Sequence, residues 1–196
     1  MTTSIIVLAV ILLVVFYAIG IYNKLVTLRN RFKNSFAQIE VQLKRRYDLI
    51  PNLVETAKGY MKHEQETFER VIQARNQALS GLKAASDAPD SQSAINQLAQ
   101  AEGMLQNALG KLSVVVEAYP ELKANQTMMQ VQEELTSTEN KISFARQAFN
   151  DAVTSYNTYK QTFPPVLFAG LFKFQDGKLL EFADSEQIQT APKVSF

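Results

Sequence analysis

Hydrophobic positions divide the chain into one continuous apolar run followed by a series of regularly spaced stripes. The run covers residues 5–21, and no charged side chain comes before Lys24. As a helix it would extend roughly 26 Å, and with Tyr22 at the level of the headgroups it would cover a hydrocarbon core of about 30 Å. The pattern therefore predicts a transmembrane anchor over residues 1–23.

A cleaved secretory signal is the alternative interpretation of this run. Such a signal begins with a positively charged region and ends at a cleavage site of the small-x-small type. Residues 2–4 are Thr-Thr-Ser, which carry no charge, and no small-x-small pair follows the run. These features favour an anchor that is retained.

Basic residues on one side of the run indicate its orientation, because Lys and Arg resist translocation. The first acid is Glu40, and before it come Lys24, Arg29, Arg31 and Lys33. We therefore expect the amino terminus outside the membrane and the bundle in the cytoplasm. A bundle on the outer face is the alternative.

Beyond the anchor, apolar residues recur at spacings of three and four, which is typical of amphipathic helices. The first stripe consists of Leu25, Leu28, Phe32, Phe36, Ile39, Leu43, Tyr47 and Ile50. It resumes after Pro51 in nearly the same phase, which favours one helix that kinks at the proline over a new helix capped by Asp48. A turn is expected at 87–91, and a further helix over 95–116.

The most regular stripe follows Pro120, a residue type favoured in the first turn of a helix. Its positions alternate like the seam of packed helices. They are Leu135, Thr138, Ile142, Ala145, Phe149, Ala152, Tyr156, Tyr159 and Phe163. Pro164 and Pro165 end this helix, and the apolar residues over 166–174 predict a short helix or strand. The last ten residues are expected to be loose.

The predicted fold class is all-α. A transmembrane helix over 1–23 is followed by an up-and-down bundle of long antiparallel helices over 24–165, because short connections make consecutive helices antiparallel neighbours. Residues 166–196 form a C-terminal tail that packs on the end of the bundle. Without the anchor about 170 residues remain, which is enough for one domain with a sizeable core.

Composition excludes several classes of function. The formal net charge is +1, which lacks the basicity of a nucleic-acid-binding protein. Cysteine is absent, which excludes disulfides and thiol nucleophiles. His63 is the single histidine, and His63-Glu64 lacks the second histidine of the zinc-protease signature because residue 67 is Thr. We expect no cofactor, no metal and no catalysis. An enzyme with Arg45, Asp48, His63 and Glu64 around a polar pocket is the alternative.

Polar residues beside the apolar stripes form a second group of candidates. Along the last predicted helix, Glu139 and Arg146 share one face, and buried charges of this kind need partners. The structural interpretation is a polar network that sets the register of the helices. Its members would be Arg45, Arg46, Asp48, Glu139, Asn140, Arg146 and Asn150. The functional interpretation is a polar groove for a ligand or a partner helix.

The basic stretch that follows the span supports a membrane-surface interpretation. Lys24, Arg29, Arg31 and Lys33 would contact anionic lipid headgroups, which attract juxtamembrane basic residues. Aromatic residues of the tail would insert beside them. A basic stretch that only fixes the topology is the alternative.

Several motifs of this chain match a bacterial family. They are YNKLVTLRN at 22–30, QLKRRYDLIPNLVETAKGYMKHE at 42–64, AR at 74–75, AYPELKAN at 118–125, QEELTSTENKISFARQAFNDAV at 132–153, YN at 156–157 and FPP at 163–165. On these motifs the chain resembles the LemA family of bacterial membrane proteins over most of residues 22–174. The family pattern usually has a tyrosine before Asn150, where this chain has Phe149. This chain therefore lacks the tyrosine hydroxyl, and any role of that hydroxyl is in doubt.

The resemblance implies a LemA-like four-helix bundle behind an amino-terminal span, in a family without an established biochemical activity. It also implies a membrane-organising or adaptor role, since one relative is implicated in forming magnetosome membranes and members are often encoded near membrane proteases. The leading hypothesis is a membrane-anchored scaffold that forms homo-oligomers through its long seam or binds an unidentified membrane protein. A lipid-binding, membrane-remodelling protein is the alternative, and membrane lipids are expected partners of both.

Overall fold

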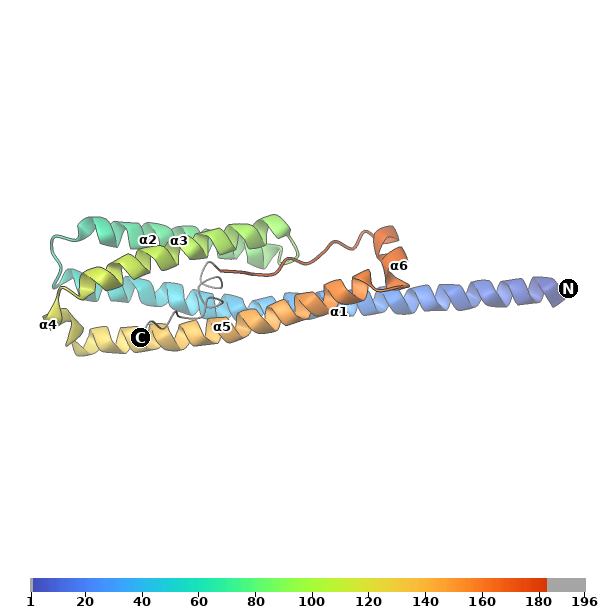
Figure 1. Cartoon of the computed structure of the whole chain (residues 1–196), viewed down its shortest axis with the longest axis horizontal. Coiled ribbons are helices and arrows are strands. Elements are labelled where there is room, and N and C mark those ends of the chain that lie inside the picture. The colour runs from blue at the N-terminus through green and yellow to red at the C-terminus, as the bar shows by residue number, and fades with distance from the viewer. Residues whose placement is uncertain (1, 183–196) are drawn as a thin grey trace, which may run out of the picture.

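The computed structural model describes residues 2–182, and these form an all-helical rod (Figure 1). The prediction of an all-α fold with packed antiparallel helices is confirmed. The helices are α1 (Thr2–Lys58), α2 (Gln65–Asp87), α3 (Gln92–Val116), α4 (Pro120–Lys123), α5 (Gln126–Gln161) and α6 (Pro165–Leu171). The predicted loose end of the tail lies outside the described residues.

Helix α1 has 57 residues and continues across Pro51. The structure thus has one helix across the proline, which was the favoured alternative. The stripe that resumes after Pro51 was expected to continue to Leu79, but it is divided between two helices, because α1 ends at Lys58 and α2 begins at Gln65. Its first part projects from the bundle (Figure 1) with its apolar side chains exposed. Within the described residues it is the one helix that is long and apolar enough to cross a membrane.

The four long helices run alternately in opposite directions (Figure 1). Helix α1 packs mainly against α5, and α2 packs mainly against α3. Side-chain caps begin two of them, because the first amides of a helix have no partner within it. The Ser91 side chain accepts a hydrogen bond from the amide of Ala94 at the start of α3, and the Asn125 side chain accepts one from Met128 at the start of α5.

The regular stripe of α5 packs on the first stripe of α1 within the same chain. Phe149 is fully buried, with its ring centroid 6.2 Å from that of Phe32 and 5.6 Å from that of Phe36. Tyr156 lies one heptad further along and packs 5.3 Å from Phe32. These near-perpendicular and tilted aromatic pairs are favoured geometries. The seam that was expected to pair two protomers is therefore occupied inside one chain.

The tail makes two kinds of contact. Helix α6 lies across the long axis of the rod, where the projecting part of α1 leaves the bundle (Figure 1). Residues 174–182 then return along α5. Asn157 and Gly177 exchange two hydrogen bonds of 2.9 Å, and Asn150 and Leu180 exchange two of 2.9 and 3.1 Å. Side-chain amides thus give the extended segment the pairing that a neighbouring strand would supply.

Candidate functional site

A buried ionic cluster joins three helices of the bundle at its middle. Arg46 of α1 is 6% exposed and Glu102 of α3 is 2% exposed, and the two form an ion pair. A second guanidinium nitrogen, Nη1 of Arg46, lies 2.6 Å from Oε2 of Glu139 on α5. The Tyr47 hydroxyl also donates a hydrogen bond to Glu102. One arginine therefore ties α1 to both α3 and α5.

Burial sets the electrostatics of this cluster. It raises the pKa of the Tyr47 hydroxyl well above its ordinary value, although the positive charge of Arg46 acts in the opposite direction. The hydroxyl therefore stays protonated and keeps donating to Glu102. Such a cluster can hold the helices in register, since an unpaired charge at these positions would be costly.

A second polar contact joins α1 to α2. Arg75 of α2 donates a hydrogen bond from Nε to the backbone carbonyl of Tyr47 at 3.0 Å. Its Nη2 atom lies 3.9 Å from the carboxylate of Asp48, which is 79% exposed. This exposed ion pair contributes little stability, whereas the backbone contact satisfies a carbonyl inside a helix.

The structure separates the remaining residues of the predicted network. Arg45 and Asn140 are exposed. Asn150 holds the tail through Leu180, and the guanidinium of Arg146 lies 4.7 Å from the ring centroid of Phe182. Glu139 and Arg146 thus share a helix but serve different contacts, one with α1 and the other with the tail.

Sequence reasoning missed Glu102, although a signal was present. Glu102 lies four residues after Leu98 and three before Leu105, which are both buried. A carboxylate in the phase of an apolar stripe indicates a buried partner of opposite charge. Nothing in the sequence identifies Arg46 as that partner, because the two lie on helices that only the fold brings together.

The residues predicted to contact lipid headgroups fall into two pairs. Arg29 and Lys33 both bind Asp90 in the turn between α2 and α3, with Arg29 Nε and Lys33 Nζ each 3.1 Å from its Oδ2 atom. Partial burial raises the pKa of Asp90, but hydrogen bonds from Arg29 and Lys33 outweigh it and lower the pKa below its ordinary value. Lys24 and Arg31 are exposed.

Two further features bear on possible chemistry. His63 is exposed, in the connection between α1 and α2. Among residues 2–182, no group of three or more His, Asp and Glu side chains is placed to hold a metal ion.

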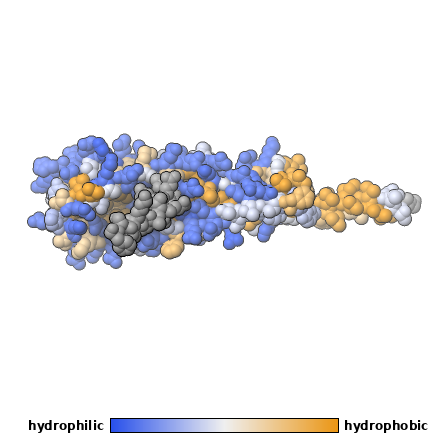
Figure 2. Space-filling view, viewed as in Figure 1, coloured by the Kyte–Doolittle hydropathy of each residue, from blue (hydrophilic) through white to orange (hydrophobic). Residues whose placement is uncertain are grey.

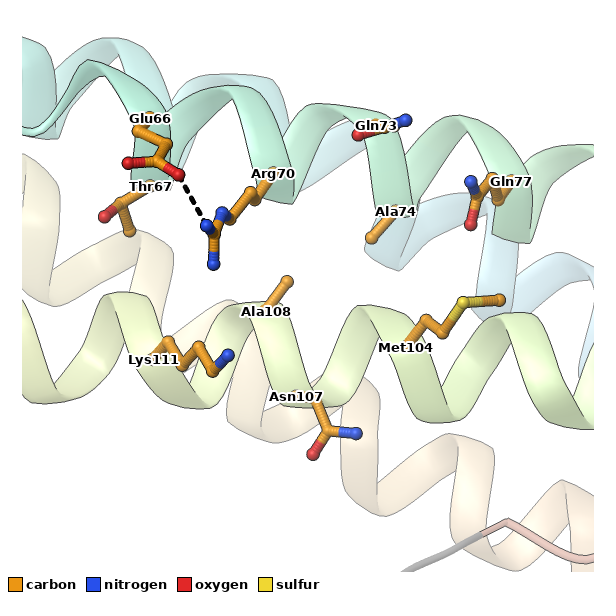
Figure 3. Close-up of a pocket in the computed structure, with 10 residues that line it drawn as sticks. All are labelled: Glu66, Thr67, Arg70, Gln73, Ala74, Gln77, Met104, Asn107, Ala108 and Lys111. Atoms are coloured by element: carbon orange, nitrogen blue, oxygen red, sulfur yellow. Dashed lines mark hydrogen bonds and ion pairs between the residues drawn. The ribbon is translucent and has the colours of Figure 1, made fainter.

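A groove of about 420 Å³ runs between α2 and α3. Figure 3 shows Glu66 and Arg70 of α2 paired on one side of it, and Met104 and Lys111 of α3 on the other.

Comparison with known proteins identifies the family. The model of the LemA family matches residues 35–196, which include the later part of α1, all of α2 to α6 and the ionic cluster. The chain belongs to the LemA family. Its LemA relatives include Protein LemA of Metamycoplasma hominis, 26% identical over 76% of this chain and 63% of the relative.

Other relatives carry a more specific name. Magnetosome protein MamQ 2 of Paramagnetospirillum magneticum is 28% identical over 69% of this chain and 56% of its own length. Magnetosome protein MamQ of Magnetospirillum gryphiswaldense is 26% identical over the same shares. This LemA-family chain thus aligns with less than two thirds of the length of each of these relatives.

Proposed function

We propose that this LemA-family chain is a single-pass, membrane-anchored scaffold that binds partner proteins or further copies of itself and has no catalysis of its own. The observation that carries the proposal is the continuity of α1, which leads from the candidate span into the bundle without a break. Beyond Ile21 the helix extends roughly 55 Å at 1.5 Å per residue. A partner on the bundle would therefore be held at a fixed distance from the membrane.

The binding surface of such a scaffold must be sought away from the α1–α5 seam, because that seam is filled. The groove between α2 and α3 is the better candidate (Figure 3). It combines charged side chains with Met104, which is 49% exposed. A polar rim around an apolar centre is the usual composition of a protein interface.

The buried cluster supports a structural part in this proposal. Glu102 binds both Arg46 and Tyr47 in the interior, and the exposed Asn140 and Arg45 lie outside this cluster. We assign the cluster to fixing the register of the helices. A rigid rod is what a scaffold needs, since a flexible one would not set the height of its partner.

The basic residues after the span favour a bundle on the cytoplasmic face of the bacterial inner membrane. The relatives named as magnetosome proteins support a membrane-organising role. These relatives support only the general class of role, because the chain aligns with only 56% of their length.

Site-specific photo-crosslinking in native membranes tests the scaffold. A photoreactive amino acid is placed at Gln77 or Asn107 in the α2–α3 groove, and at Ser155 on the exposed face of α5 as the matched control. We expect a discrete adduct from the groove positions and none from Ser155. Native mass spectrometry of the full chain in nanodiscs then tells a second copy from another protein. A strictly monomeric chain without groove adducts would contradict the proposal.

The enzyme alternative has its own test. It would depend on Arg45, Asp48, His63 and Glu64, of which Arg45, Asp48 and His63 are exposed. We expect the His63→Ala and Asp48→Ala variants to restore the wild-type phenotype to a deletion strain as fully as the unaltered chain does. Loss of complementation at normal protein levels would favour the enzyme instead.

A further inference from the structure

Exposed apolar side chains gather in one place on the bundle. Phe163 is 80% exposed, Leu167 is 64% exposed and Leu171 is 74% exposed, and Val166 and Phe172 lie beside them in sequence with 45% and 40%. We call these five residues the α6 patch. Elsewhere on the bundle, exposed apolar residues such as Val41, Val114 and Phe144 are single. Scattered apolar residues are normal on a protein surface, whereas a contiguous patch indicates a partner.

The α6 patch begins where the candidate span ends. Tyr22, directly after the apolar run, packs edge-on against Phe172 at 5.1 Å and against Phe174 at 5.7 Å. Ile21 belongs to the apolar run yet is only 3% exposed, because the end of the bundle covers it. In Figure 2 the hydrophobic surface of the projecting helix is continuous with that of the adjoining end of the bundle.

The opposite face of α6 fixes it to the bundle. Pro165 and Ala169 are buried, so the helix presents one side to the core and the other to its surroundings. At its end, the amide of Phe174 donates to the carbonyl of Ala169 and the amide of Lys173 donates to that of Gly170, which is the Schellman arrangement. Lys173 occupies its left-handed position with φ 56°.

The residues after α6 are held as well. Lys160 of α5 donates a hydrogen bond to the carbonyl of Phe174 and lies 2.6 Å from the carboxylate of Asp176. The hydrogen bond from Lys160 to Asp176 and the positive charge of Lys160 hold the pKa of Asp176 below its ordinary value despite partial burial. The α6 patch is therefore carried by an ordered element with a defined position beside Tyr22.

We infer that the α6 patch lies in the interfacial region of the bilayer and forms a second membrane contact beside the span. This inference rests on the proposed membrane anchor. Apolar and aromatic side chains on one face, with an exposed lysine at the end, form the composition of an element that lies in the interface with its charge among the headgroups. Lys24 and Lys173 are both exposed here.

The consequence is mechanical. A single span is free to tilt in the bilayer, by about 20° on average. A second contact to one side of the span resists tilting, and it thereby sets the direction in which the rod leaves the membrane. The α6 patch would thus orient the bundle as well as hold it.

Tryptophan fluorescence provides a direct test, since the chain contains no tryptophan. The full chain is reconstituted in phosphatidylcholine–phosphatidylglycerol vesicles that contain lipid brominated near the headgroup end of the acyl chain. Phe163→Trp and Leu167→Trp place the probe in the α6 patch. Phe144→Trp is the matched control, because Phe144 is 74% exposed and lies on α5, about 28 Å from Phe163 along the helix.

We expect the brominated lipid to reduce the emission of both patch variants at least twofold and to leave that of the Phe144→Trp variant unchanged. Val14→Trp, in the span, reports separately on the anchor with lipid brominated deep in the chain. Patch variants without quenching, beside a quenched Val14→Trp variant, would overturn the inference and leave the anchor intact. No quenching at any position would overturn the anchor together with the inference.

Discussion

Arg75 donates a hydrogen bond to the one backbone carbonyl of α1 that Pro51 leaves without its helical partner. In a continuous helix the carbonyl of Tyr47 would accept from the amide of residue 51, and proline has no amide hydrogen. Arg75 Nε reaches that oxygen at 3.0 Å from the neighbouring α2. The side chain of one helix therefore repairs the backbone of another, which explains how α1 continues across a proline.

Arg75→Met should destabilise the chain by about 1–3 kcal/mol, because it leaves the Tyr47 carbonyl without a partner. Pro51→Ala restores the missing amide, so the same arginine change should cost clearly less in the Pro51→Ala background. Thermal unfolding in detergent, followed by circular dichroism, measures the cycle of four variants. Arg70→Met, on the exposed side of α2, is the matched control and should change stability by less than about 0.5 kcal/mol. Equal costs in both backgrounds would show that Arg75 acts in another way.

The ionic cluster predicts how variants of its residues should rank in their free energy of unfolding. Arg46→Met leaves Glu102 buried without its counter-charge and should cost about 3–5 kcal/mol. Glu139→Gln should cost less than about 1 kcal/mol, since the Glu139 side chain is 46% exposed. The double change of Arg46→Met with Glu102→Leu removes both charges and should be more stable than Arg46→Met alone. Urea unfolding in detergent gives these differences, and a double variant worse than the single one would contradict the buried pairing.

Asp90 predicts how stability changes with pH. Its pKa in the folded chain lies below the ordinary aspartate value of about 3.9. The stabilisation is therefore complete above that value and is lost as the pH falls through the lower, folded pKa. At pH 7, Asp90→Asn should cost up to about 1 kcal/mol, and the difference from the unaltered chain should vanish in strong acid. Thermal unfolding between pH 2 and pH 7 measures it. Asp87→Asn removes a carboxylate nearby and is the control; an equal pH dependence in both variants would contradict the assignment.

The asparagines of α5 predict a local effect on the tail. Asn150→Ala removes both hydrogen bonds to Leu180, each worth roughly 0.5–1.5 kcal/mol. The amide of Leu180 should then exchange its hydrogen about tenfold faster or more, because about 1.4 kcal/mol corresponds to a factor of ten. Hydrogen exchange resolved to single amides measures this. Asn140→Ala, on the exposed face of α5, should leave the rate unchanged, and an unchanged rate in Asn150→Ala would show that other contacts hold the segment.

Two helical glycines predict opposite effects of the same substitution. A Cβ atom on Gly81 would lie 3.2 Å from the Cα of Leu98, so α2 and α3 would have to separate. Gly81→Ala should cost about 1–3 kcal/mol for this reason. A Cβ on Gly110 meets nothing within 4 Å, and Gly110→Ala should stabilise α3 by roughly 0.5–1 kcal/mol. Thermal unfolding of the two variants checks the sign, and a stable Gly81→Ala variant would argue against close packing of α2 on α3.

The sequence by itself determined most elements of this protein, but not the break over 59–64 that separates α1 from α2. The apolar run over 5–21, the spacing of three and four along α1 and α5, and the turn at 87–91 were all correct in type, because helical periodicity and turn residues are local properties. The sequence also indicated the continuation of α1 across Pro51 through the preserved phase of its stripe.

Only the tertiary structure decided which residues meet. Arg46 with Glu102, Arg75 with the Tyr47 carbonyl, and Asn150 with Leu180 are pairs from segments far apart in the chain. The sequence offered Glu139 and Arg146 as neighbours on one face, and packing gave each a different partner. The seam of α5 was equally suited to a second protomer or to α1. Periodicity defines a face, whereas what covers that face depends on how the connections fold the helices together.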